Sequence, residues 1–161
     1  MHYNAPRRVA IIGGRRIPFC RANTSYTHQS NQHMMTAALQ ALVDAYRLGG
    51  ERLGDVALGA VMKHSRDWNL ARECVLGTTL AAETPAYDLQ RACGTSLEAA
   101  IQIGNKIALG QIDAGIAGGT ALHLENIRFS WRWGAFTNNG RNREVSNNNT
   151  ALATFTDNFF D

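Results

Sequence analysis

The sequence contains few of the features that mark several large classes of protein. No stretch approaches the roughly 18 consecutive apolar residues that a membrane-spanning helix needs, so we expect no membrane span. The 161 residues include only three cysteines, and these are far apart. This spacing argues against a disulfide framework and against a cysteine-based zinc site. We therefore expect reduced thiols and a cytoplasmic protein.

Motifs for metals, nucleotides and nucleic acids are also missing from the sequence. His28 and His33 are five residues apart, whereas two histidines that bind a metal from one helix face are four apart, so we predict no metal site. Gly13 and Gly14 follow an apolar run, but no G-x-G-x-x-G pattern opens a helix there. The net charge of +3 comes with scattered arginines rather than a basic face, so we expect no nucleic-acid partner.

The sequence does contain an alternation of short apolar runs and segments with helical periodicity. Three of the four runs are apolar on both faces, which is typical of strands buried between layers of helices. The third run alternates between apolar and polar residues and predicts a strand at the edge of the sheet. The predicted strands are 8–13, 55–62, 86–91 and 113–119, and the predicted helices are 31–48, a segment capped by Asn69 that ends before Pro85, and a segment after Cys93 that ends at Gly110.

This order predicts an α/β fold, β-α-β-α-β-α-β, in which a mostly parallel sheet carries helices on both faces. The composition changes after Thr120, because the segment 121–161 is rich in asparagine and shows no sustained period of 2 or 3.6 residues. We therefore predict one domain over residues 7–120 and a weakly structured tail over 121–161. The strand at 113–119 would then lack a neighbour on one side unless the tail covers it.

One cysteine, Cys93, lies where the third predicted strand passes into the third predicted helix. A thiol at a helix N terminus experiences the partial positive charge of unpaired backbone N–H groups, which favours the thiolate and makes the sulfur a nucleophile. Gly94 leaves room for a substrate, and Thr95 and Ser96 can satisfy donors of the first helical turn. The alternative for a lone cysteine is burial in the core, which we expect for Cys74.

Four motifs along the chain together resemble the N-terminal part of a thiolase, one of the acyl-CoA acyltransferases that cleave or form 3-ketoacyl-CoA. They follow one another in the order and at the intervals of that family, over residues 7–120. The sequence around the cysteine is most similar to that of the thiolases of fatty-acid β-oxidation and of acetyl-CoA acetyltransferases. The motifs are Arg16-Ile17-Pro18-Phe19, Asn69-Leu70-Ala71-Arg72, the segment from Arg91 to Ala99, and Ala117-Gly118-Gly119-Thr120.

The resemblance implies that Cys93 attacks an acyl-CoA, holds the acyl group as a thioester, and passes it to coenzyme A or to a second acetyl-CoA. The backbone N–H of Cys93 is then a candidate donor to the oxyanion. Coenzyme A and acetyl-CoA would be substrates, and no bound cofactor is implied. A homodimer or a higher homo-oligomer through the edge strand at 85–91 is the family expectation.

The resemblance also implies partners for Cys93 that this sequence does not contain. Thiolases carry a histidine in a Gly-His-Pro motif, an asparagine motif and a second cysteine in Cys-x-Gly, and nothing here matches them. We therefore expect a truncated domain that is inactive, or nearly so, by itself and that associates with itself. A non-catalytic remnant used for binding is one alternative. A β-ketoacyl synthase relative is another, although Arg16-Ile17-Pro18-Phe19 favours a thiolase.

Overall fold

The computed structural model describes residues 6–20, 24–61, 63, 65–120 and 150–156. Most of the tail predicted at 121–161 lies outside these residues, but its segment 150–156 forms a strand. The elements are, in chain order, β1 (Val9–Arg16), α1 (Asn31–Ala45), β2 (Asp55–Leu58), α2 (Leu70–Leu76), β3 (Ala86–Asp88), α3 (Thr95–Ala108), β4 (Ala114–Gly119) and β5 (Thr150–Thr156).

The described strands form a single sheet in the order β1-β5-β4-β2-β3. β2 runs parallel to β3 and to β4, whereas β5 runs antiparallel to β4 and to β1. Four of the five strands therefore point in the same direction, which confirms the predicted α/β fold with a mostly parallel sheet. β3 lies at one edge, as its alternating sequence predicts.

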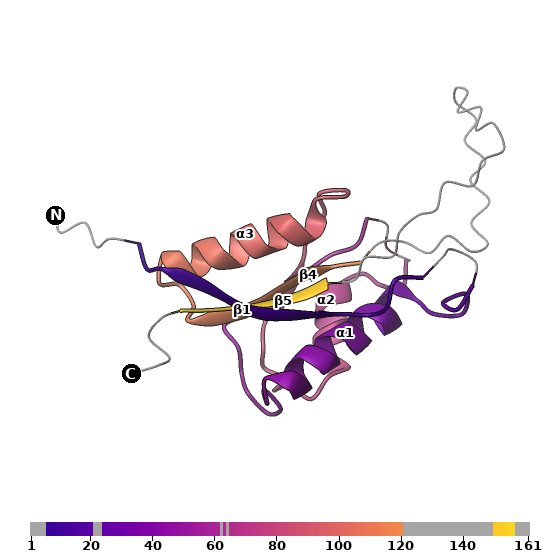
Figure 1. Ribbon diagram of the computed structural model, residues 1–161, viewed down its shortest axis with the longest axis horizontal. Coiled ribbons are helices and arrows are strands. Elements are labelled where there is room, and N and C mark those ends of the chain that lie inside the picture. The colour runs from indigo at the N-terminus through magenta and orange to yellow at the C-terminus, as the bar shows by residue number, and fades with distance from the viewer. Residues whose placement is uncertain (1–5, 21–23, 62, 64, 121–149, 157–161) are drawn as a thin grey trace, which may run out of the picture.

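Helices cover both faces of the sheet, with α3 on one side and α1 on the other (Figure 1). The larger core lies between the sheet and the pair α1 and α2, where Leu39, Leu42, Val56 and Ile116 are fully buried. The smaller core lies under α3, where Ile103 and Ile107 meet alanines of β2 and β4. Residues of β2 belong to both cores, so helices cover this strand on both faces. This confirms the prediction from its apolar run.

The helix boundaries follow capping residues that are visible in the sequence. Ser30 caps α1, because its hydroxyl accepts a hydrogen bond from the backbone N–H of His33, and Asn69 caps α2 in the same way through the N–H of Arg72. α3 is followed by Gly110, which has a φ of +71°, a conformation that glycine adopts without strain. All three predicted helices are therefore present.

β1 differs from the prediction, because it is an edge strand and not a buried one. It pairs with β5 from Val9 to Arg16, and no other described strand lies beside it. Ile11 is accordingly 65% exposed. The apolar run at 8–13 predicts burial, but the position of a strand in the sheet order depends on residues far away in the chain.

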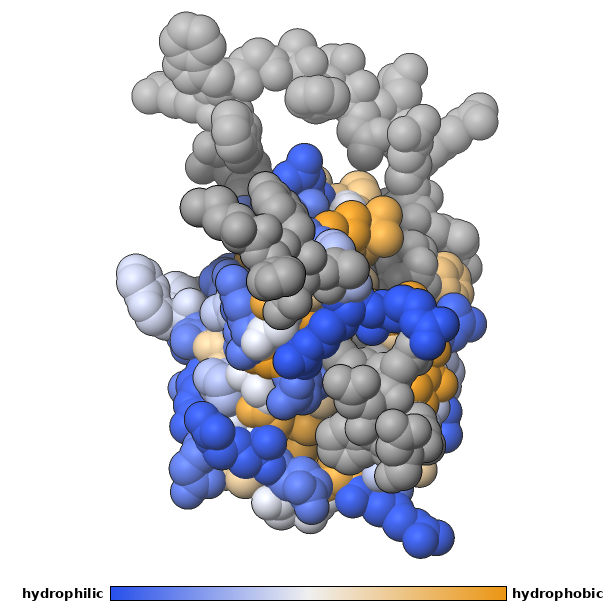
Figure 2. Space-filling model, turned by 90° about the vertical axis from the view of Figure 1, so that its left-hand side faces the viewer, coloured by the Kyte–Doolittle hydropathy of each residue, from blue (hydrophilic) through white to orange (hydrophobic). Residues whose placement is uncertain are grey.

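β5 also gives β4 its second neighbour. The two strands pair from Ala114 to Gly119, so the strand that we expected to be exposed unless the tail covered it is covered by 150–156. The outward side of α3, by contrast, is open among the described residues, and its Leu97 is 67% exposed. Figure 2 shows one side of the molecule, on which apolar residues lie between hydrophilic ones.

No helix among the described residues is long and apolar enough to span a lipid bilayer.

Candidate active site

Cys93 lies in a tight turn that joins β3 to α3 and is exposed at the surface. The backbone N–H of Gly94 donates to the carbonyl of Arg91 at 2.9 Å, and the N–H of Thr95 donates to the carbonyl of Ala92 at 3.2 Å. Ala92 has a φ of +46°, which is unfavourable for a residue with a Cβ. The turn therefore holds a strained backbone directly before the candidate nucleophile.

The buried side chain of Thr95 stabilises this turn through two hydrogen bonds. Its Oγ1 accepts a hydrogen bond from the N–H of Arg91 at 2.9 Å and donates to the carbonyl of Ala92 at 2.8 Å. The N-cap of α3 is Gly94, and no side chain hydrogen-bonds there. Thr95 thus stabilises the strained turn instead of capping the first helical turn, which is the role that the sequence predicts for it.

Two glycines at the carboxyl ends of neighbouring strands make room for the turn. An ideal Cβ on Gly59, which follows β2, would overlap the carbonyl oxygen of Leu89 and lie 2.6 Å from Cγ2 of Thr95. An ideal Cβ on Gly119, which ends β4, would lie 3.1 Å from the backbone nitrogen of Ser96. The Ala117-Gly118-Gly119-Thr120 motif therefore acts by allowing α3 to approach the sheet closely at its N terminus.

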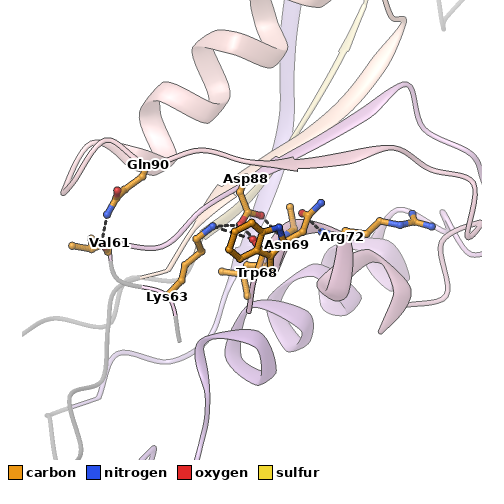
Figure 3. Close-up of polar contacts among 9 residues, drawn as sticks. Val61, Lys63, Trp68, Asn69, Arg72, Asp88 and Gln90 are labelled. Atoms are coloured by element: carbon orange, nitrogen blue, oxygen red, sulfur yellow. Dashed lines mark hydrogen bonds and ion pairs between the residues drawn. The ribbon is translucent and has the colours of Figure 1, made fainter. Parts of the chain in front are cut away.

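A polar cluster holds the end of β3 on the side away from α3 (Figure 3). The carboxylate of Asp88 accepts hydrogen bonds from the N–H groups of Leu70 at 3.0 Å and Ala71 at 2.6 Å, and it also pairs with the ammonium of Lys63. A carboxylate at a helix N terminus is favoured by the partial positive charge there. Asp88 thus fixes β3 to both α2 and the segment before it.

The Asn69-Leu70-Ala71-Arg72 motif completes this support. Asn69 caps α2, and the guanidinium of Arg72 donates to the carbonyl of Thr84 at 2.9 Å and to that of Ala82 at 2.6 Å. These carbonyls belong to the segment that leads into β3. The motif therefore positions the strand that carries Cys93, and it does so through structural contacts and not through contact with Cys93.

A second row of polar side chains lies between β3 and α3. Glu98 pairs with Arg91 at 3.5 Å and accepts from Gln102 at 3.1 Å, and Gln102 in turn accepts from the hydroxyl of Tyr87 at 3.0 Å. The ammonium of Lys106 lies 4.3 Å from the centre of the Tyr87 ring and pairs with Asp55. The two sides of the Cys93 turn are thus held by different sets of charged residues.

These contacts shift the titration of two groups in the row. Burial raises the pKa of Tyr87, while the charge of Lys106 opposes the shift. Burial by itself lowers the pKa of Lys106, but the hydrogen bond and the charge of Asp55 outweigh it, so that the pKa of Lys106 is raised. Tyr87 is therefore a neutral hydrogen-bond donor and Lys106 is a cation at neutral pH.

The other two cysteines have different surroundings. Cys74 is buried in the larger core, as predicted, and burial raises its pKa to about 12. The thiol of Cys20 lies 2.9 Å from the hydroxyl of Thr24, whose hydrogen bond lowers the pKa of Cys20. Within the part of the chain that the structure describes, no group of three or more His, Cys, Asp or Glu residues could hold a metal ion.

The fold is shared with a solved structure of known identity. The chain superposes on the crystal structure of the acetyl-CoA acetyltransferase of Bacillus anthracis with a TM-score of 0.70, at 22% sequence identity, over 83% of this chain and 35% of that chain. This likeness establishes the fold.

Sequence comparison identifies the family. Residues 9–152 match the N-terminal domain of thiolases, so the chain belongs to the thiolase family. It is 37% identical over 112 residues to a 3-ketoacyl-CoA thiolase of Vibrio cholerae, which covers 70% of this chain and 26% of the relative. A 3-ketoacyl-CoA thiolase of Aliivibrio fischeri is 35% identical, with 70% and 25% covered. The chain thus spans about a quarter of the length that these relatives have.

Proposed function

We propose that this chain carries the acyl-accepting half-site of a thiolase-type acyl-CoA acyltransferase, with Cys93 as the nucleophile. The observation that supports this most directly is the exposed thiol in a strained turn at the N terminus of α3. Backbone N–H groups at such a terminus favour the negative charge of a thiolate and of an oxyanion. The family match favours this function over that of a β-ketoacyl synthase.

In the proposed reaction, the thiolate of Cys93 attacks the carbonyl carbon of an acyl-CoA thioester. The carbonyl oxygen becomes an oxyanion, to which the N–H of Cys93 is a candidate donor. Collapse of this intermediate breaks the bond to the sulfur of coenzyme A, which leaves as a thiolate and takes up a proton from solvent. The acyl group remains on Cys93 as a thioester, and splitting the transfer in this way replaces one difficult step by two easier ones.

Completion of the cycle needs groups that the sequence does not contain. The acyl group would pass to a coenzyme A thiolate, or to the carbanion of a second acetyl-CoA, and either acceptor must first lose a proton. None of the five histidines lies in a Gly-His-Pro motif. We therefore infer that the chain alone takes up at most one acyl group per molecule and does not turn over.

Acetylation of Cys93 tests this function. Folded protein is incubated with acetyl-CoA, and peptides are examined by mass spectrometry for a thioester on Cys93. The expected result is acetylation at Cys93 that hydroxylamine removes and that a Cys93→Ser variant lacks, while the buried Cys74 in the same molecule stays unmodified. Folded protein without acetylation at Cys93 would instead support a non-catalytic remnant used for binding.

We further propose that the chain pairs with a second copy through the segment 85–91, in the cytoplasm. β3 is an edge strand, and an edge strand presents unpaired N–H and C=O groups that a second strand can satisfy. Trp68, which is 89% exposed, lies close to the end of β3 beside Lys63 (Figure 3). Exposed tryptophans are common at the centres of protein interfaces.

A further inference from the structure

α3 presents three polar side chains at a spacing of four residues toward β3 and the Cys93 turn. Glu98, Gln102 and Lys106 lie on one stripe of the helix, since residues four apart share a helix face. Each of them contacts a residue of another element or of the turn. The contacts are Glu98 with Arg91, Gln102 with Tyr87, and Lys106 with Tyr87 and Asp55.

Glu98 is an unexpected residue at this place. A carboxylate in the first turn of the helix that follows a candidate nucleophile repels the anionic groups that approach it. Both oxygens of this carboxylate are engaged, Oε1 by Gln102 and Oε2 by Arg91. Its side chain is only 24% exposed, so the charge is held in one place.

The orientation of Glu98 is set independently of Arg91. The hydroxyl of Tyr87 donates to Oε1 of Gln102, which leaves the amide of Gln102 to donate to Glu98. Arg91, by contrast, has a side chain that is 71% exposed, and an exposed arginine has many rotamers of similar energy. Glu98 therefore provides a fixed anchor for a guanidinium that would otherwise move freely in solvent.

Arg91 begins the turn that contains Cys93 and precedes it by two residues. The Cα atoms of Arg91 and Cys93 are at most about 7.6 Å apart. This distance is shorter than the Debye length at physiological ionic strength, so salt screens a charge at this range only in part. On the opposite side of the turn, the charges of Lys63 and Asp88 pair with each other. Among these groups, Arg91 is the cation nearest to Cys93 along the chain.

We propose that Glu98 is a positioning residue for Cys93, which holds the guanidinium of Arg91 beside the turn so that its positive charge attracts anionic groups to the thiol. This inference rests on the proposed role of Cys93 as nucleophile. In this arrangement the carboxylate makes the potential at Cys93 more positive, whereas its own charge would make it more negative. Removing Glu98 then makes Cys93 less attractive to anions, although a negative charge has been removed.

Two alkylating reagents of different charge test the proposal. Iodoacetate is an anion and iodoacetamide is neutral, so the ratio of their rates at Cys93 reports the local potential and not the general accessibility of the thiol. The rates are measured by mass spectrometry of the Cys93 peptide at fixed pH and low salt. Cys20 in the same molecule provides the control ratio, because no described contact joins it to Glu98 or Arg91.

The expected result is that Glu98→Gln and Arg91→Gln both lower the ratio at Cys93, by on the order of threefold for one charge at this separation in water. Arg91→Lys restores most of the ratio, and the ratio at Cys20 stays constant. In the Arg91→Gln background, Glu98→Gln raises the ratio, because only the repulsion by the carboxylate then remains to be removed.

An increase of the ratio in Glu98→Gln alone would overturn the proposal, since a carboxylate that acts only by its own charge gives that result. An unchanged ratio in Arg91→Gln would overturn it as well, and this variant alters a side chain that is 71% exposed. If the wild-type protein and its variants gave the expected alkylation ratios but Cys93 were not acetylated by acetyl-CoA, the proposed function would be contradicted and the role of Glu98 would not. The two failures are therefore distinguishable.

Discussion

Gly59 shows how one missing side chain determines where the Cys93 turn can lie. The residue directly follows β2, and any Cβ at this position would collide with the carbonyl oxygen of Leu89 and with Thr95. The carbonyl belongs to the backbone, which cannot rotate away as a flexible side chain can. The segment from β3 to α3 and the carboxyl end of β2 are therefore in contact without any side chain between them.

We expect Gly59→Ala to lower the free energy of unfolding by at least about 2 kcal/mol, because overpacking against backbone forces atoms to shift. Urea unfolding measures this change, and the rate of Cys93 alkylation measures the displacement of the turn. Gly49→Ala is the matched control, since its Cβ would meet only ordinary contacts with Thr79 at 3.5 Å. Equal stability of the two variants would contradict the close contact.

Cys74 is a residue whose burial should be visible in the pH dependence of stability. Burial raises its pKa from the ordinary value of 9.0 to about 12. Between these pH values the unfolded chain loses the thiol proton and the folded chain keeps it. The unfolded state then binds fewer protons, so the free energy of unfolding falls as the pH rises from about 9 toward 12.

We expect Cys74→Ala to reduce this alkaline loss of stability, although the variant is less stable at neutral pH because it leaves a small cavity. Urea unfolding at pH 8, 9 and 10 gives the slope. Val75→Ala serves as the control and keeps the wild-type slope, because it also leaves a cavity in the same core but removes no titratable group. The same slope in all three proteins would show that Cys74 is not titrated during unfolding.

Among the elements, α2 depends on a residue from outside itself. A helix of seven residues is too short to be stable alone. Two of its first N–H groups donate to Asp88, and a third donates to its N-cap Asn69. Because Asp88 belongs to β3, the short helix and the strand before Cys93 stabilise each other.

Asp88→Ala should destabilise the chain by about 1 to 3 kcal/mol, since it leaves two N–H groups without their acceptor and removes the carboxylate that pairs with Lys63. Thermal unfolding and hydrogen exchange of the α2 amides measure the effect, with exchange faster at Leu70 and Ala71 than elsewhere. Glu73→Gln changes an exposed charge of the same helix and should alter stability by less than about 0.5 kcal/mol. Matching losses in both variants would argue against the cap.

The elements themselves are largely predictable from the sequence, because their signals are local. Ser30, Asn69 and Gly110 mark helix ends, and the apolar runs at 55–62 and 113–119 mark buried strands, although β2 ends early at Leu58. The position of Cys93 is also local, since a strand followed by a cysteine and a helix is readable as such. The residues that support the turn cannot be identified from the sequence. Asp88, Glu98 and Gly59 act through contacts with residues that only the fold brings close.

For the whole molecule, both outer strands of the described sheet present an open edge. The backbone of β3 pairs with β2 through Pro85 and Leu89, and the register places Val56 opposite Ala86. In a parallel pair alternate residues bond to the same neighbour, so the N–H groups of Ala86 and Asp88 point to the open side. A second copy of the chain can pair there.

We therefore expect the protein to sediment as a dimer or a larger species. We also expect Ala86→Pro to shift it toward the monomer, because proline removes an outward N–H without breaking the bonds to β2. Analytical ultracentrifugation over a range of concentrations measures the change. Circular dichroism checks that the variant keeps its secondary structure. A wild-type chain that is monomeric and melts cooperatively would contradict self-association.

The order of strands could not be read from the sequence, and the reason is the position of β5. Residues 150–156 follow an asparagine-rich segment without periodicity, and nothing local indicates that they enter the sheet between β1 and β4. Their entry moves β1 to the edge and explains why an apolar run such as Val9–Arg16 is exposed. Pairings between distant segments determine such positions, whereas composition and spacing report on neighbours in the chain.

The place of β5 also has a consequence for synthesis on the ribosome. β1 is translated first among the strands, yet its sheet partner is β5, the last of the described strands. At about 5 to 20 residues per second, β1 waits on the order of ten seconds for that partner, while β2, β3 and β4 can already pair. During this interval an apolar strand is available to chaperones, and a slow codon before residue 150 would prolong it.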